Sequence, residues 1–502
     1  MRASGILLPI FSLPSEYGIG CFSKEAYEFV DFLKASGQKY WQILPLGPTG
    51  FGASPYQSYS TFAGNPYFID VTEFEKLGYV TKADLEKYDA TGTDLEKIDY
   101  GLLEERRMVL LKKAFENSGF CAQSGSRGTD VEKFCKKEAF WLEDYALFMA
   151  LKNAFSGKSW NQWDEKIRLR HEKALRECRK KYSDDIEFYK FIQFFFWKQW
   201  TALKKYANES GVEIIGDIPI YVAFDSADTW AFPELFDLNE DNVPNNVAGC
   251  PPDFFSATGQ LWGNPLYDWE YHKKTGYSWW LKRVGKCFEL VDGLRIDHFR
   301  GFDEFWSIPY GDPTAEFGKW LPGPGYELFA TIKKNYGKKM IIAEDLGLIT
   351  DSVRKLVKKT GYPGMKVLQF AFGGADPKNE YLPQNCDKNY VIYTGTHDND
   401  TTRGWYRDLQ KNDKKALNFF KKYSGCKRED KAAECMTLMA MTSVADTCII
   451  LMQDYLNLPE SARINTPSTV GCNWSWRMKK DALSDKLSLE IKKLTKLSNR
   501  MQ

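Results

Sequence analysis

Short runs of apolar residues that end in polar or turn-forming residues recur along this chain, and they constrain its fold more than any other feature. We interpret eight of them as strands, because each is short, apolar and followed by a turn signal. These runs cover residues 5–9, 41–46, 212–222, 291–297, 340–344, 365–372, 390–397 and 447–454. Helical patterns, such as residues 23–36 and 351–359, lie between most of them. Apolar strands that alternate with helices indicate parallel pairing, and eight such units predict an α/β fold, the (β/α)8 TIM barrel.

Two connections between the expected strands are much longer than a barrel normally uses. We predict one catalytic barrel domain over residues 1–502, with a largely helical subdomain inserted at residues 60–210 after the second strand. A second insertion, at residues 223–290, follows the third strand and contains the loop-like run GCPPDFFSATGQLWGNPLY. Because βα connections open at the C-terminal face of a barrel, we expect both insertions to wall the mouth of the site.

Composition and charge argue against several classes of function. Lys and Arg total 68 against 67 Asp and Glu, a net charge of +1, so nothing predicts a nucleic acid or an anionic membrane as partner. The apolar stretch near the N-terminus is interrupted by Pro9 and Pro14, and no run approaches the ~18 residues of a membrane span. The 11 cysteines are scattered and never spaced as C-x-x-C, which indicates reduced thiols. We therefore expect a cytoplasmic protein with a neutral substrate.

Acidic residues stand at the ends of three of the expected strands. The fourth strand ends in LRIDHFRG, the fifth in IIAEDLG and the seventh in YTGTHDNDT. The C-terminal ends of barrel strands meet at one rim, where enzymes of this fold hold their active sites. Asp297, Glu344 and Asp398 are therefore predicted to converge there.

Glycoside chemistry needs one carboxylate to attack the anomeric carbon and a second carboxyl to protonate the departing oxygen. Retaining enzymes hold this pair ~5–5.5 Å apart. Asp297 and Glu344 come from neighbouring strands, whose backbones lie ~4.7–4.9 Å apart, so this separation is reachable. Arg295 points to the same side of its strand as Asp297 and is expected to keep that carboxylate ionised.

The third carboxylate has a different expected role. Asp398 can bind sugar hydroxyls and steady the positive charge of an oxocarbenium-like transition state. Either His397 or His298 is expected to donate a hydrogen bond to substituents of the sugar ring. Each motif alone also has a structural interpretation, since R-x-D pairs stabilise many strand ends and A-E-D-L-G can cap a helix. The coincidence of three carboxylates at matching strand ends favours the catalytic interpretation.

Metal chemistry fits the sequence poorly. The D-N-D of residues 398–400 is similar to the opening of a calcium loop, but Arg403 stands where that loop requires Gly. A metal-dependent amidohydrolase barrel needs H-x-H on its first strand, which is missing, and the chain has only 4 histidines. We therefore expect no metal and no organic cofactor.

Together these residues resemble a known family. The runs that carry the resemblance are RIDHFRGF, AEDLG, GTHDNDT, IIGDIPIYV, PPDFFSATGQLWGNPLY, LPLGPTGFGASPYQ and NWSWR. They are similar to motifs of the amylomaltases, the 4-α-glucanotransferases or disproportionating enzymes of glycoside hydrolase family 77, over about residues 5–480. The resemblance implies a catalytic barrel with helical inserted subdomains and no C-terminal β-sandwich.

The resemblance also implies roles for single residues. By motif, Asp297 is the nucleophile, Glu344 the general acid/base and Asp398 the stabiliser of the transition state. Further substrate-binding residues by motif are Tyr56, Asp217, Asp253, Arg295, His397 and Asn473. Trp262 falls in the flexible loop that covers the acceptor side, where it would help to exclude water. Phe51 stands where some relatives carry Tyr in an outer glucan site, so stacking is expected to remain while one hydrogen bond is lost.

The activity implied is transfer of a segment of an α-1,4-glucan to the 4-hydroxyl of an acceptor glucan or glucose, through a glucosyl-enzyme intermediate on Asp297. Maltooligosaccharides are the expected substrates, with starch or glycogen as longer candidates. Two alternatives stay open: an α-glucan hydrolase with water as acceptor, and a non-catalytic glucan-binding protein. Observation of transfer would argue against the hydrolase. The presence of all three carboxylates argues against the glucan-binding protein.

Overall fold

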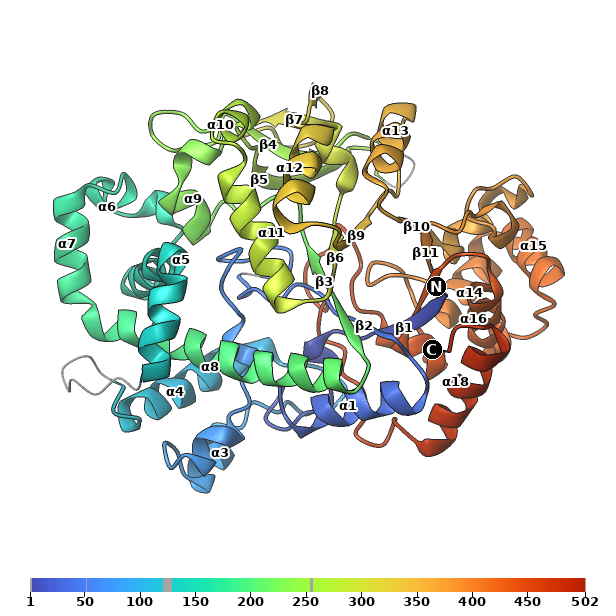
Figure 1. Ribbon diagram of the computed structural model, residues 1–502, viewed down its shortest axis with the longest axis horizontal. Helices are drawn as coiled ribbons and strands as arrows, with labels where there is room; N and C mark the ends of the chain where they lie inside the picture. The colour runs from blue at the N-terminus through green and yellow to red at the C-terminus, as the bar shows by residue number, and fades with distance from the viewer. Residues whose placement is uncertain (1, 51, 121–128, 253–255, 502) are drawn as a thin grey trace.

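The eight expected strands form one sheet that curls into a nearly closed barrel. The computed structural model describes residues 2–50, 52–120, 129–252 and 256–501 (Figure 1). All pairs within the sheet are parallel, in the order β10-β11-β12-β1-β2-β3-β6-β9. The strands are β1 (Ala3–Leu7), β2 (Tyr40–Gln42), β3 (Glu213–Ile218), β6 (Gly293–Ile296), β9 (Met340–Ala343), β10 (Gly364–Val367), β11 (Tyr390–Tyr393) and β12 (Thr447–Leu451). The predicted TIM barrel is confirmed.

The strands end earlier than the apolar runs suggested. After Val367 the chain forms a 3-10 helix, η7 (Leu368–Ala371), and after Leu451 it forms α17 (Met452–Tyr455). Both segments are buried although they leave the sheet. Apolar residues there cover the barrel rather than extend its strands. A hydrophobic run alone does not show whether it forms a strand or a buried helical segment.

A few hydrogen bonds complete the barrel between β9 and β10. The amide of Ala343 donates to the carbonyl of Pro363 at 2.9 Å, and the amide of Met365 donates to Oδ1 of Asp345 at 2.7 Å. Gly364 leaves the space that this carboxylate needs, because an added Cβ would lie 2.4 Å from Oδ2 of Asp345. Closure therefore depends on Ala343 and Asp345, the residues on either side of Glu344.

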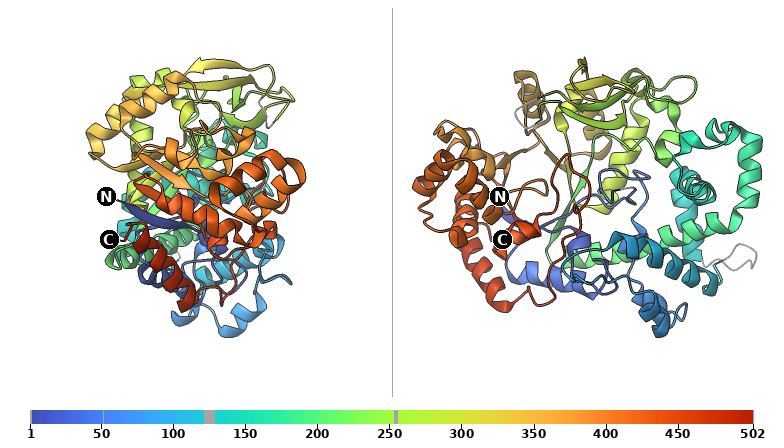
Figure 2. Two further views of the ribbon diagram at one scale, coloured as in Figure 1. Left: turned by 90° about the vertical axis from the view of Figure 1, so that its right-hand side faces the viewer. Right: turned by 180° about the vertical axis from the view of Figure 1, so that it is seen from behind.

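The longest connection, between β2 and β3, is helical. It contains α2 (Thr72–Lys76), α3 (Lys82–Lys87), α4 (Tyr100–Asn117), α5 (Thr129–Ala154), α6 (Glu165–Arg168), α7 (Glu172–Lys181) and α8 (Ser183–Glu209). Helix α8 is buried on nearly all sides between Ile186 and Trp200, as a helix packed between other elements is, while its last turns have an exposed face. Its C-terminal end leads into β3, so the helices stand against the side of the barrel (Figures 1 and 2).

An antiparallel sheet, which the sequence analysis did not predict, lies beside the barrel near the end of β6 (Figure 1). Its strand order is β5-β4-β7-β8. Two strands, β4 (Asn246–Cys250) and β5 (Gln260–Pro265), precede β6, while β7 (Glu304–Pro309) and β8 (Lys319–Pro322) follow it. Helices α9 (Ala227–Ala231), α10 (Trp269–Lys274) and α11 (Ser278–Leu290) belong to the same connection between β3 and β6.

The remaining helices cover the outside of the barrel. They are α1 (Lys24–Ala35), α12 (Tyr326–Tyr336), α13 (Asp351–Thr360), α14 (Thr402–Asn412), α15 (Lys414–Ser424), α16 (Ala432–Thr442) and α18 (Asp485–Leu497). Helices α14–α16 and α18 lie on the side opposite α5–α7 (Figures 1 and 2). Beyond β12 the described chain forms helices and loops but no further β-sheet. Among the described residues, no helix is long and apolar enough to cross a membrane.

Candidate active site

Arg295 joins two carboxylates at the end of adjacent strands. It lies on β6 directly opposite Asp217 on β3, and Asp297 follows two residues later. Its Nη1 donates to both carboxylate oxygens of Asp217, at 2.8 and 2.7 Å, and its Nη2 donates to Oδ1 of Asp297 at 2.8 Å. Burial lowers the pKa of Arg295, but the two aspartates outweigh this and hold it well above its ordinary value. Asp297 therefore faces a permanent cation, as the sequence predicted.

Tyr56 and His397 extend this cluster across the mouth of the barrel. The hydroxyl of Tyr56 donates to Oδ2 of Asp217 at 2.7 Å and lies 3.4 Å from Nδ1 of His397. The two rings stack with their centroids 5.0 Å apart, and Trp474 lies 5.8 Å from each. Burial and the charge of Asp217 raise the pKa of Tyr56, so its hydroxyl keeps its proton and remains a donor. Four residues predicted to bind the sugar, Tyr56, Asp217, Arg295 and His397, thus form one network.

Glu344 has a different environment although its position is equivalent. It follows β9 as Asp297 follows β6, and the preceding residues of the two strands, Ile296 and Ala343, are directly paired. Its carboxyl oxygens accept from two backbone amides, those of His298 at 2.7 Å and Leu346 at 3.0 Å. Burial, followed by the charge of Asp297, raises the pKa of Glu344 to about 8. Glu344 therefore holds a proton at neutral pH.

Asp398 is fixed by residues from a loop that the sequence analysis did not single out. Its Oδ1 accepts from Nδ2 of Asn465 at 2.7 Å, and its Oδ2 lies 3.4 Å from Nε2 of His397. Arg463 donates to the backbone carbonyl of Asp398 at 2.7 Å. Partial burial raises the pKa of Asp398, but His397 and Asn465 more than offset this and hold it well below its ordinary value. A lone Asn beyond the last barrel strand gives no motif, so only the folded loop reveals it.

Trp262 stands on the edge strand β5 rather than in a loop. Its ring packs edge-on against the imidazole of His298, with centroids 4.8 Å apart, and its Nε1 donates to Oε1 of Gln260 at 3.2 Å. Burial lowers the pKa of His298 to about 4, so this imidazole is neutral near pH 7. Trp262 therefore packs against the side chain of the residue whose backbone amide donates to Glu344.

Three other predicted substrate-binding residues give less information. The side chain of Asn473 accepts from the amide of Thr466 at 3.0 Å and donates to the carbonyl of Thr469 at 3.0 Å, so it braces its own loop. Phe51 and Asp253 lie outside the residues that the structure describes.

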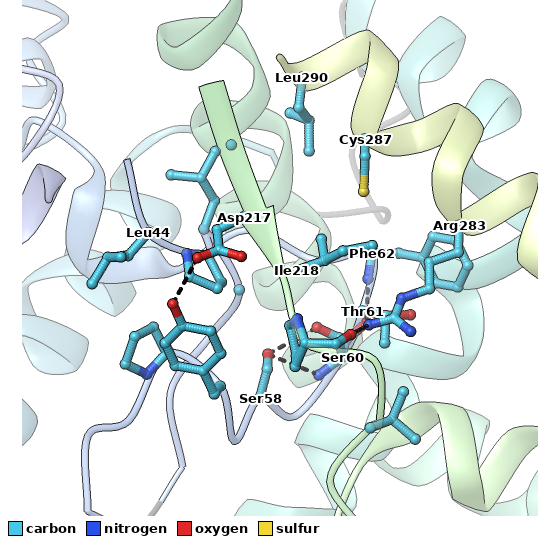
Figure 3. A pocket seen from close by; sticks show the side chains of 18 of the residues that line it. Leu44, Ser58, Ser60, Thr61, Phe62, Asp217, Ile218, Arg283, Cys287 and Leu290 are labelled. Atoms are coloured by element: carbon cyan, nitrogen blue, oxygen red, sulfur yellow. Dashed lines mark hydrogen bonds between the residues drawn. The ribbon is translucent and has the colours of Figure 1, made fainter. Parts of the chain in front are cut away.

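A cavity opens beside the polar network and continues past β3 to helix α11 (Figure 3). Its empty volume is about 700 Å³, open solvent included. Tyr56 and Asp217 line one end, and Cys287 and Leu290 of α11 line the other. Asp297 and Glu344 are not among its lining residues, so this space lies beside the reacting groups. In the described part of the chain, no group of three or more His, Cys, Asp or Glu side chains could hold a metal ion.

The fold and the site together define a class of protein. Two carboxyl groups at adjacent strand ends of a (β/α)8 barrel, one next to a guanidinium and the other holding a proton, are the arrangement of barrel enzymes that act on glycosidic bonds. Comparison with known families makes this specific. The model of the glycoside hydrolase family 77, described as 4-alpha-glucanotransferase, matches residues 8–484. The chain belongs to this family of enzymes, which confirms the resemblance seen in the motifs.

Individual relatives cover the whole chain. A 4-alpha-glucanotransferase from Clostridium butyricum is 48% identical over 497 residues, which are 98% of this chain and 100% of the relative. An amylomaltase from Streptococcus agalactiae, solved in complex with acarbose, superposes with a TM-score of 0.95 at 43% identity and 100% coverage of both chains. An amylomaltase from Corynebacterium glutamicum superposes with a TM-score of 0.79 at 17% identity, and the match covers 99% of this chain and 75% of that protein. At this identity the match supports the fold alone.

Proposed function

We propose that this chain transfers a segment of an α-1,4-glucan to the 4-hydroxyl of an acceptor glucan or glucose, by a retaining double displacement. The observation that carries the proposal is the contrast between Asp297, which is paired with Arg295, and Glu344, whose pKa is raised to about 8. A retaining mechanism needs one ionised and one protonated carboxyl at neutral pH. Membership of the 4-alpha-glucanotransferase family supplies the substrate class.

In the first half-reaction, Glu344 donates its proton to the glycosidic oxygen while a carboxylate oxygen of Asp297 attacks the anomeric carbon. The bond between that carbon and the leaving oxygen breaks, the reducing-end fragment departs with a new hydroxyl, and an ester forms on Asp297. Asp398, whose pKa is held low, stabilises the positive charge that develops on the sugar. Asp217, Tyr56 and His397 are proposed to bind the same sugar unit.

In the second half-reaction, Glu344 is ionised and acts as the base. It takes the proton of the acceptor 4-hydroxyl, whose oxygen attacks the anomeric carbon and displaces Asp297. Glu344 is then protonated again and both carboxyl groups are restored. Retention of the anomeric configuration follows because the carbon is inverted twice.

Transfer competes with hydrolysis because water at ~55 M can enter instead of a sugar. A ~10⁴-fold preference for the sugar corresponds to ~5.5 kcal/mol. We propose that Trp262, packed against His298, supplies part of this preference by stacking on the acceptor and excluding water. Phe51, Asp253 and Asn473 remain proposed substrate contacts on the basis of the family motifs.

The domain organisation and the location of the protein also remain proposals. We assign residues 60–210 to an inserted subdomain and residues 223–290 to a second insertion of a single barrel domain, supported by the helices α2–α8 and by β4, β5 and α9–α11. A cytoplasmic location is supported by the sequence, whose 11 cysteines are scattered and never spaced as C-x-x-C.

Incubation with maltotriose tests the activity directly. Transfer predicts glucose together with a ladder of longer maltooligosaccharides, while the number of reducing ends stays constant. A hydrolase would release glucose and maltose with steadily rising reducing ends and no ladder. A glucan-binding protein would leave maltotriose unchanged, and Asp297→Asn would then have no effect.

A further inference from the structure

Arg300 is a buried cation that follows the strand end bearing Asp297 and contacts the loop after Glu344. It lies in the 3-10 helix η6 (Phe299–Phe302), three residues after Asp297, and is 5% exposed. Its guanidinium lies over the ring of Trp320, 3.9 Å from the centroid. Its Nη1 donates to the backbone carbonyl of Leu348. The side chain therefore joins the nucleophile strand to two elements that are distant in the sequence.

Trp320 is held firmly by the antiparallel sheet. It lies on β8 directly opposite Trp306 of β7, with ring centroids 5.1 Å apart, and Nε1 of Trp306 donates to the carbonyl of Ala315 at 2.8 Å. The end of β8 is fastened to η6, because the amide of Gly323 donates to the carbonyl of Asp303 at 2.7 Å. The ring under Arg300 thus has a fixed position relative to Asp297.

Leu348 belongs to the loop that carries the proton donor. It follows Glu344 by four residues, and within this loop the amide of Leu346 donates to Oε1 of Glu344. The opposite side of Glu344 is bound from the nucleophile strand: the amide of His298 donates to Oε2, and the amide of Phe299 donates to the backbone carbonyl at 3.0 Å. Arg300 is the side chain that continues this connection to the far end of the loop.

The surroundings of Arg300 suit a positioning role. Its Nε is buried without a hydrogen-bond partner. Burial lowers the pKa of Arg300 and outweighs Cys250, Glu304 and Asp303, which raise it, and among the described residues no carboxylate lies within ion-pair distance of its guanidinium. An aromatic face and a carbonyl compensate a buried guanidinium only in part, since burial without an ionised partner is costly. A methionine or leucine at this position would avoid that cost but could not bind both the ring and the carbonyl.

We propose that Arg300 is a positioning residue for Glu344, which clamps the loop of residues 345–349 between η6 and Trp320. The clamp keeps the amide of Leu346 on the carboxyl and keeps water away from it. This inference rests on the proposed role of Glu344 as proton donor and extends it to the antiparallel sheet, which thereby contributes to catalysis without touching the sugar.

Substitutions at both ends of the clamp test it. Arg300→Lys keeps the charge but loses the planar stacking, and Trp320→Leu removes the ring while leaving the arginine. We expect kcat for maltotriose disproportionation to fall about 10–100-fold in each, with KM changed less than about 2-fold. The basic limb of the pH profile is expected to move by about one unit to lower pH, because a more hydrated Glu344 loses its proton more readily. Trp320→Phe, which keeps a ring, is expected to lie between wild type and Trp320→Leu.

A matched control binds the same loop from helix α13. Arg354 donates to the carbonyl of Ile349, the residue after Leu348, but it is exposed. Arg354→Gln is expected to leave kcat and the pH profile unchanged. Circular dichroism and the melting temperature establish that each variant is folded, and if Arg300→Lys does not fold, the two Trp320 variants carry the test.

Other outcomes would overturn the inference. Unchanged kcat and pH profile in a folded Trp320→Leu would show that the clamp does not position Glu344. A rise in KM alone would show that the ring contacts sugar. If the wild type itself gives no ladder from maltotriose, the proposed transfer activity fails, whereas the clamp is then judged on the rate of glycosidic bond cleavage.

Discussion

Asp297 and Glu344 stand one residue beyond two neighbouring strands, yet their surroundings differ in kind. Asp297 shares the guanidinium of Arg295 with Asp217, so a full positive charge lies 2.8 Å from it. Among the described residues, Glu344 accepts only from the backbone amides of His298 and Leu346. The comparison teaches that two equivalent positions on one rim acquire different electrostatic surroundings before any substrate is bound, Asp297 through a neighbouring guanidinium and Glu344 through burial.

The largest test of this comparison removes each carboxyl in turn. Asp297→Asn is expected to lower kcat by roughly 10⁴-fold or more, because no ester can form. Glu344→Gln is expected to lower kcat on maltotriose by about 10²–10⁴-fold, because the leaving oxygen is no longer protonated. Product ladders measured over time give both rates.

The choice of leaving group then separates the two roles. Fluoride departs without a proton, so Glu344→Gln is expected to release fluoride from α-maltosyl fluoride at close to the wild-type initial rate. Asp297→Asn is expected to release none beyond background, as measured with a fluoride electrode. Equal loss of fluoride release in both variants would show that Asp297 and Glu344 do not have the separate roles of nucleophile and proton donor.

The next test removes the charge that makes the two sides different. Arg295→Met leaves the buried carboxylate of Asp217 and the partly exposed carboxylate of Asp297 without their shared cation. We expect kcat to fall about 10²–10³-fold and the free energy of unfolding to fall by about 3–5 kcal/mol. Activity assays and urea denaturation measure the two effects.

Arg107 supplies the matched control for that variant. It is equally buried, at 1% exposure, but donates to the carbonyls of Ile69 and Tyr17. Arg107→Met is expected to lower stability while the folded enzyme keeps its kcat. A similar loss of kcat in both variants would mean that Arg295 acts through stability alone.

The pH profile of the activity tests the protonation state of Glu344. Since the pKa of Glu344 is raised to about 8, its proton is present below that pH and lost above it. We expect the rate of the first half-reaction to be level near pH 7 and to fall about 10-fold per unit above pH 8. In Glu344→Gln, fluoride release from α-maltosyl fluoride is expected to lack this basic limb. A wild-type limb that begins near pH 5 would contradict the assignment of Glu344 as the protonated partner.

The sequence alone was sufficient to predict that these carboxyl groups lie at strand ends, because the end of a strand is encoded locally. Arg295 and Asp297 share one run of apolar residues, and Glu344 ends another, so the two-residue period and the barrel rim bring them together. The pairing of Arg295 with Asp217 and the stacking of Tyr56 on His397 depend on register and loop path between segments far apart in the sequence. Family motifs named these residues, but their contacts came only from the fold.

The antiparallel sheet was missed for a related reason. Its strands β4 and β5 precede β6, and β7 and β8 follow it, so they pair across the barrel strand that carries Asp297. No tight hairpin turn marks β4 and β5 in the sequence, and β8 has only four residues. Short strands whose partners are distant carry little local signal, because cross-strand packing rather than propensity stabilises them.

The smallest effect that we predict concerns the loop residue that no motif indicated. Asn465→Ala removes the donor to Oδ1 of Asp398. A hydrogen bond to a charged group contributes about 1.5–3 kcal/mol, so we expect kcat to fall roughly 10–100-fold. The effect is expected towards the lower end of this range because Asp398 is half-exposed. Asn457→Ala, which removes a bond to the carbonyl of Asp430, is expected to leave kcat unchanged. If the two variants have the same kcat, the position of Asp398 is maintained by His397 and by its own backbone. The role of Asp398 in catalysis would then depend less on neighbouring side chains than the roles of Asp297 and Glu344 do.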